Sequence, residues 1–239
     1  MLLGAIGSSS TAFWYLTRAT GVVALLLLTL VVALGVVDVS RISTPSWPRF
    51  LTDALHRQAS LLAVIFLGLH IITAVLDSYA PISLIDAFIP FHSAYRPFWL
   101  GLGAAAFDLL LAVFITSLMR ARVGARNWRL IHWLAYASWP LAVIHGFGTG
   151  SDVRRSWMLF LDVVCILTVL GAVWVRVRLS EHPTRAGRAW AGGLTAAFVL
   201  GLIIWLPSGP LAAGWARRAG TPLRLIRSLH VVRSSAGTR

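Results

Sequence analysis

Long apolar runs separated by short polar connections dominate the sequence. Six runs approach the roughly 20 apolar residues that a helix needs to cross a bilayer. They cover about residues 14–38, 54–76, 99–119, 130–147, 157–175 and 189–206. Proline, glycine and arginine are concentrated in the connections between them, where they end helices or face water. The pattern predicts an all-α protein, a polytopic membrane helix bundle of about six transmembrane helices.

The composition agrees with this class of protein. Hydrophobic residues make up 58% of the chain, and the mean hydropathy of +0.79 is too high for a soluble domain. A formal charge of +13 is also typical of nucleic-acid-binding proteins. Here, however, the arginines flank apolar runs, so we expect lipid headgroups as their partners and no nucleic acid. The single cysteine, Cys165, lies within an apolar run, which excludes an internal disulfide and a thiolate metal site. No charged region precedes the first apolar stretch, so we expect no cleavable signal peptide.

Arginine positions predict the orientation of the bundle. The connections after the first, third and fifth runs contain Arg41, Arg49, Arg57, Arg120, Arg122, Arg126, Arg129, Arg176, Arg178, Arg185 and Arg188. The opposite side, apart from the C-terminal tail, contains Arg18, Arg96, Arg154 and Arg155. By the positive-inside rule the first group lies in the cytoplasm, and we expect a multi-pass protein of the plasma membrane.

Two further segments have a less regular pattern. Residues 77–98 are rich in proline and aromatic residues and predict a short amphipathic cap along the membrane surface. The basic tail, 207–239, is expected outside the helical core. Its LRLIRSLHVV stretch has the alternative of lying on a membrane surface as a basic amphipathic helix.

Four histidines within two of the predicted spans are the strongest chemical signal. His56 and His70 are fourteen positions apart in one span, and His132 and His145 are thirteen apart in another. At about 1.5 Å of rise per residue, each spacing places its two histidines roughly 20 Å apart, one near each membrane face. If both spans run from inside to outside, His56 pairs with His132 and His70 with His145. Each pair would supply two axial imidazoles to a tetrapyrrole iron, which favours electron transfer over oxygen binding.

The spacing also makes a structural demand. Fourteen residues return to within about 40° of the same helix face, but thirteen miss it by about 140°. Pro140 lies between His132 and His145, and a proline kink or local unwinding would supply the missing rotation. The alternative is that these histidines are isolated polar residues that hydrogen-bond between helices. A compact non-haem metal site needs its ligands closer together than these spacings allow.

Other polar residues are secondary candidates. Haem propionates need cations near the membrane faces, and Arg57 and Arg129 are the inner candidates and Arg96 the outer one, with ordinary orientation signals as the alternative. Asp108 is an intramembrane carboxylate and a candidate for quinol proton transfer or a structural hydrogen bond. Asp162 ranks below it. His92, His182 and His230 fall in connections or the tail, where only His92 would approach the outer cofactor.

These histidines, with the stretches TSLMRARVGARNWRLIHW and WPLAVIHGFGTGSD, resemble the ferric reductase-like transmembrane domain family. Its members include the membrane parts of ferric reductases and NADPH oxidases and the haem-binding subunit of the bacterial periplasmic methionine sulfoxide reductase system. The resemblance covers residues 14–178, leaving 179–239 as an additional transmembrane helix and basic tail. It implies two b-type haems at the four histidines, as in a cytochrome b, and electron flow from the cytoplasmic side outward.

The sequence departs from the larger family members in having no recognisable flavin or nicotinamide domain. We therefore expect an oxidoreductase membrane subunit that receives electrons from a partner protein or a quinone, with FMN as a further candidate cofactor. The alternative is a non-redox transporter that uses Asp108 and the histidines as a proton or cation relay. The sequence has neither the internal repeats nor the continuous polar path of a transporter. A structural assembly factor is the third possibility.

Overall fold

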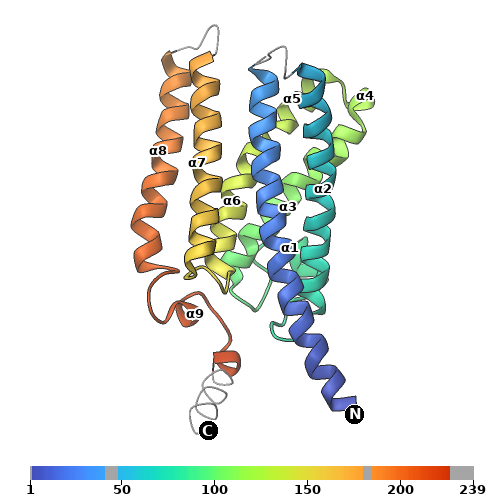
Figure 1. Ribbon diagram of the computed structural model, residues 1–239, viewed down its shortest axis with the longest axis vertical. Helices are drawn as coiled ribbons and strands as arrows, with labels where there is room; N and C mark the ends of the chain where they lie inside the picture. The colour runs from blue at the N-terminus through green and yellow to red at the C-terminus, as the bar shows by residue number, and fades with distance from the viewer. Residues whose placement is uncertain (1, 41–47, 180–184, 227–239) are drawn as a thin grey trace.

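The computed structural model describes residues 2–40, 48–179 and 185–226, and within these ranges the chain is built from helices and connections alone (Figure 1). The elements are α1 (Leu2–Val39), α2 (Arg49–Leu76), η1 (Leu84–Ala87), α3 (Pro97–Leu118), α4 (Arg120–Val123), α5 (Ala125–His132), α6 (Leu134–Thr149), α7 (Ser156–Leu179), α8 (Arg185–Ser208) and α9 (Trp215–Arg218). The all-α prediction is confirmed for these residues.

Within the described residues, five helices are long and apolar enough to cross a membrane. They cover Ala12–Val39, Arg49–Leu76, Pro97–Leu118, Ser156–Arg178 and Arg188–Ser208. The remaining predicted span, 130–147, is divided between α5 and α6, neither of which reaches that length alone. The chain is thus a membrane protein with several apolar helices, and six remains the predicted number of crossings.

The bundle consists of two tightly packed helix pairs with further helices beside them. α1 packs along α2, and α3 packs along α6, while α7 lies against α1 and α8 against α7. The core is centred on α6, whose Trp139, Val143 and Phe147 are buried between α1 and α7. The indole Nε1 of Trp139 donates to the hydroxyl of Thr29 on α1 at 3.0 Å, so this contact joins the two pairs through a polar bond.

The helix ends that carry arginines of the orientation argument lie at one end of the bundle. The start of α2, the short α4 and the end of α7 lie at the top of Figure 1, and α9 lies at the opposite end. The described arginine-rich helix ends therefore share one end of the molecule, as that argument requires.

The connection between α2 and α3 forms a folded cap. Around η1, Leu84 and Ile85 are exposed, whereas Asp86 is only 4% exposed. Burial of the polar residue and exposure of the apolar ones suit a segment whose outer face meets lipid. This distribution agrees with the cap predicted for this region, whose place along a membrane surface stays a prediction.

The segment after α8 corrects a prediction. Residues 209–221 do not extend away from the core but turn back onto the ends of α3 and α6, where Ala219 and Thr221 are buried. The reason is a set of hydrogen bonds from Arg96 and Trp215 that no local pattern reveals. Residues 227–239, with most of the predicted amphipathic stretch, lie outside the described residues.

Candidate functional site

Two pairs of histidine rings face each other inside the bundle. His56 on α2 lies opposite His132 at the end of α5, with 6.3 Å between the ring centroids. His70, nearer the other end of α2, lies opposite His145 on α6 at 6.4 Å. These are the pairings predicted from the direction of the helices. All four residues are half-buried, and the two pairs lie toward opposite ends of the bundle.

A break in the helix lies between His132 and His145, which is the local unwinding expected as the alternative to a proline kink. α5 ends at His132, and Pro140 lies within the uninterrupted α6. At the junction the amide of Trp133 donates to the carbonyl of Leu130 at 3.3 Å, and the amide of Tyr136 donates to Trp133 at 3.0 Å. These three-residue bonds belong to a turn tighter than an α-helix. The rotation expected near Pro140 therefore begins one helical turn or more before it.

The separation within each pair fits a metal ion bound between the rings. Metal–imidazole bonds are about 2.0–2.1 Å long and the ring centre lies about 1.1 Å farther, so two opposed ligands have centroids about 6.3 Å apart. The observed values are 6.3 and 6.4 Å. Among the described residues no group of three or more histidine, cysteine or acidic side chains is placed to hold a metal ion. The donor set is thus two imidazoles per pair, which suits an ion whose other ligands come from a macrocycle.

Three of the four rings are oriented by backbone carbonyls. The bonds join His56 Nδ1 to Val31 O at 3.1 Å, His70 Nδ1 to Thr17 O at 2.8 Å and His145 Nδ1 to Trp99 O at 2.9 Å. A carbonyl only accepts, so each Nδ1 carries the proton, and a neutral ring then keeps a free lone pair on Nε2. This is the usual outer-shell arrangement of a metal-binding histidine.

His132 is held differently. Its Nδ1 is buried and has no hydrogen-bond partner among the described residues. The centroid of its ring lies 4.9 Å from that of Trp128. The Trp128 ring also contacts Arg120, whose guanidinium carbon lies 4.1 Å from the ring centroid. The Trp128 Nε1 donates to the hydroxyl of Ser117 at 3.2 Å. Aromatic packing therefore positions this ring in place of a hydrogen bond.

Glycines make room for three of the imidazoles. A Cβ added at Gly21 would lie 2.9 Å from the His70 ring, and one at Gly103 would lie 2.4 Å from Nδ1 of His145. At Gly35 the nearest atom of His56 would be 3.3 Å away. Gly21 and Gly35 are fourteen residues apart, as are the two histidines they contact, so both face α2. Sequence reasoning missed this matched spacing, which was visible in the chain.

The buried polar atoms without partners also point to these two regions. Within the described residues they are Thr17 Oγ1, Arg18 Nε, Ser40 Oγ and His132 Nδ1. One belongs to Thr17, whose carbonyl accepts the His70 bond, and one to the next residue, Arg18; a third directly follows α1, and the fourth belongs to a paired histidine. Buried polar groups in native proteins are normally paired, so such atoms indicate a place for a polar ligand or water. Together with the donor set and the glycine cradles, they fit a carboxylate-bearing macrocycle.

The three arginines predicted to bind haem propionates differ in their exposure to solvent. Arg57 and Arg129 are exposed at the His56–His132 end. Arg96 is buried, and its guanidinium is engaged by Thr221 and Gly148. Arg18, which sequence reasoning did not select, forms an ion pair with Asp152 and lies 4.0 Å from the Trp14 ring.

The remaining candidates do not join the histidine pairs. Asp108 on α3 is half-buried, and Asp162 on α7 is 6% exposed. His92 instead bonds Asp86 through Nδ1 at 2.7 Å. Burial raises the pKa of the Asp86 carboxyl, but hydrogen bonds from Ser83 and His92 outweigh it and leave that pKa below its usual value. His182 and His230 lie outside the described residues.

Comparison with known proteins identifies a family. Residues 20–143 match the family described as ferric reductase like transmembrane component. This range is just over half of the chain, contains His56, His70 and His132, and ends two residues before His145.

Similarity to individual proteins is limited. A stretch of 132 residues, 49% of this chain, is 29% identical to alpha-(1->6)-mannopyranosyltransferase A of Mycobacterium tuberculosis, of which it covers 26%. The chain thus spans about a quarter of that protein, too little to carry its activity over. No solved structure matches the chain.

Proposed function

We propose that this chain, which belongs to the ferric reductase-like transmembrane family, conducts electrons across the bilayer through two b-type haems. Membrane electron transfer is what the family indicates. The finer assignment is ours: one haem between His56 and His132, the other between His70 and His145.

The observation that carries the proposal is that two histidine pairs, toward the two ends of one bundle, each have the ring separation of two ligands to one metal ion. Fourteen residues along α2 separate the couples by about 21 Å, which spans most of the apolar layer. When bound, each haem would supply a one-electron iron couple with both axial positions filled by imidazole.

The chain's own residues would bind the haems, orient their histidine ligands and keep water away from them. The carbonyls of Val31, Thr17 and Trp99 hold the Nδ1 protons of three histidines, so the Nε2 lone pairs of these rings are free to bind iron. Apolar helix faces exclude water, which prevents side reactions and sets the potential. The exposed Arg57 and Arg129 are available to carboxylates at the His56–His132 end. The guanidinium of Arg96 bonds Thr221 and Gly148, so we do not propose it as the carboxylate partner at the His70–His145 end.

The positive-inside orientation sets the direction. It places the His56–His132 end in the cytoplasm, where a flavin-containing partner or a membrane quinol would donate electrons. The His70–His145 end would then reduce an outer-face acceptor. We assign the protein to the plasma membrane on the same grounds, with residues 14–178 as the conducting domain.

The test is the absorbance spectrum of the purified full chain in lipid nanodiscs, oxidised and then reduced with dithionite, with haem measured per chain. Sharp low-spin b-type bands at two haems per chain are expected. His70→Ala and His132→Ala should each remove one haem. His92→Ala, a histidine outside both pairs, is the matched control and should keep two. A colourless protein produced with ample haem would overturn the proposal and favour the relay through Asp108.

A further inference from the structure

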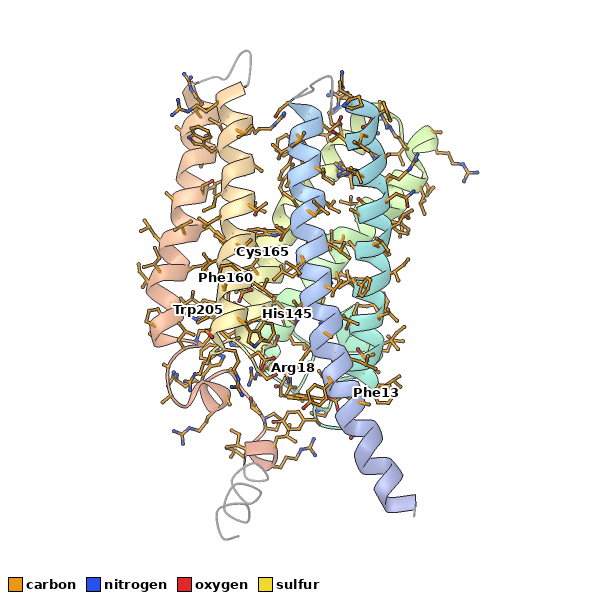
Figure 2. The ribbon with its side chains drawn as sticks, in the orientation of Figure 1. Phe13, Arg18, His145, Phe160, Cys165 and Trp205 are labelled. Carbon is orange, nitrogen blue, oxygen red and sulfur yellow. The ribbon has the colours of Figure 1, made fainter. Side chains whose placement is uncertain are left out.

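The segment that follows α8 is fastened to the end of the bundle that holds His145. Figure 2 places His145 and Trp205 toward the same end, together with Arg18. From Trp205 the chain turns back through α9, and Ala219 and Thr221 are 4% and 6% exposed. This burial lies in contact with α3 and α6, the two helices that hold the His145 ring.

Arg96 is the first fastening point. It precedes α3 and is 8% exposed, with φ of 44° in the left-handed region. Its Nε donates to the Thr221 hydroxyl at 2.9 Å, its Nη1 to the Gly148 carbonyl at 2.9 Å, and its amide to the Gly220 carbonyl at 3.2 Å. A buried cation is costly unless its donors are satisfied, so these bonds hold one specific arrangement.

The Gly148 carbonyl is the second point, because it receives two side-chain donors. Besides Arg96 Nη1 it accepts from the indole Nε1 of Trp215 at 3.1 Å. Gly148 lies three residues after His145 in the last turn of α6. A Cβ at Gly148 would lie 2.6 Å from the ring of Trp99, so helix and ring are in direct contact there.

Trp99 connects the segment to the imidazole itself. Its carbonyl accepts the Nδ1 proton of His145 at 2.9 Å. Its ring stacks on Trp205 with centroids 4.7 Å apart and planes 18° apart, and it lies 5.1 Å from the ring of Trp215. The residue that orients His145 is therefore in contact with Trp205, in the last turn of α8, and with Trp215 of the segment that follows.

We infer that residues 205–221, the C-terminal cap formed by the last turn of α8 and the segment that follows it, position His145 by fixing both Trp99 and the last turn of α6. The cap lies outside the family match, which ends at residue 143, as does His145 itself. The inference rests on the proposed function for its effect on the haem. Loosening the cap weakens the Trp99–His145 bond, which lowers the basicity of the imidazole and raises the potential of its haem.

The experiment uses single substitutions in the full chain. Thr221→Val removes the hydroxyl that Arg96 binds, and Trp215→Phe removes the N–H to Gly148 while keeping an aromatic ring. Thr221→Ser restores the hydroxyl. Arg217→Gln is the control within the same segment, because Arg217 is exposed and its side chain makes no hydrogen bond among the described residues.

Redox titration in nanodiscs is the first readout. Thr221→Val and Trp215→Phe should raise the potential of one haem, leave the other unchanged and weaken retention of the affected haem about 10-fold. Thr221→Ser and Arg217→Gln should match the parent chain. In a His70→Ala background, which keeps only the His56–His132 haem, Thr221→Val should have no effect. Equal shifts of both haems, or the same shift in Arg217→Gln, would overturn the inference.

Hydrogen exchange of haem-free protein is the second readout and separates the two proposals. Thr221→Val should speed amide exchange in residues 145–150 and leave the first turns of α2 unchanged. If the chain binds no haem, the proposed function fails, but this measurement still decides the role of the cap. Unchanged exchange at residues 145–150 contradicts it.

Discussion

Gly103 offers the sharpest single test of how the helices hold the imidazoles. A methyl group there would lie 2.4 Å from Nδ1, 2.6 Å from Cε1 and 2.8 Å from Cγ of His145. All three distances are below any normal contact, so the ring must move, and Nδ1 is the atom that bonds Trp99 O. We expect Gly103→Ala to disrupt that bond and to release the haem of this pair.

A graded series gives the magnitude. Overpacking a filled site costs about 1–3 kcal/mol, against which alanine gains about 0.8–1 kcal/mol over glycine in a helix. Gly103→Ala should therefore destabilise by up to about 2 kcal/mol, with Gly21→Ala (2.9 Å from His70) less affected and Gly35→Ala (3.3 Å from His56) close to neutral. Gly68→Ala is the control, because nothing lies within 4 Å of its Cβ, and it should be slightly stabilising.

The assay combines thermal unfolding with haem per chain for the four variants in one nanodisc preparation. For a chain of this size about 1 kcal/mol changes the midpoint by about 2–4 °C. The midpoints should fall in the order Gly68→Ala, Gly35→Ala, Gly21→Ala, Gly103→Ala. Full retention of two haems by Gly103→Ala at an unchanged midpoint would refute the packing argument.

Three further predictions follow from single contacts. Since His132 lacks a partner for Nδ1, the haem left in His70→Ala should transfer to apomyoglobin about 10-fold faster than the haem left in His132→Ala, measured by absorbance. The pKa of Asp86 is lower in the folded protein, so its contribution to stability is complete above the unfolded pKa of about 3.9 and is lost as pH falls through the folded pKa. In thermal melts from pH 6 to 3, the melting temperature of Asp86→Asn should therefore fall less with acid than that of the parent chain. Trp139→Phe leaves the buried hydroxyl of Thr29 without the indole donor and should lower the unfolding free energy by about 1–3 kcal/mol, measured by thermal unfolding.

The histidine pairing was predictable from the sequence because it depends on few variables. Alternating helix direction and arginine position decide which end each histidine occupies, and depth then pairs His56 with His132 and His70 with His145. The site of the helix break was not predictable, because proline is the only breaker visible in WRLIHWLAYASWP, and a proline can remain inside a helix. The break falls at Trp133, where three-residue bonds replace helical ones.

Long-range polar contacts account for most of what the sequence concealed. Arg96 and Thr221 are 125 positions apart, and no periodicity or spacing relates them. Arg96 therefore had the same local signature as an arginine at a membrane face, although it is buried. By contrast, the cradle of Gly21 and Gly35 repeats the spacing of His56 and His70 and was open to inspection.

The two histidine pairs differ in how firmly the protein holds them, and the difference matches the proposed direction of electron flow. In the His70–His145 pair both Nδ1 atoms are bonded to carbonyls, and a glycine lies against each ring. His132 instead rests against Trp128, near the exposed Arg120 and Arg129. A basic, loosely constrained end suits transient docking of an acidic electron donor, whereas a rigid pair keeps its potential constant. Reversing the charge at Arg129 should therefore slow reduction by such a donor, with a weaker effect at high salt, and leave both haem potentials unchanged.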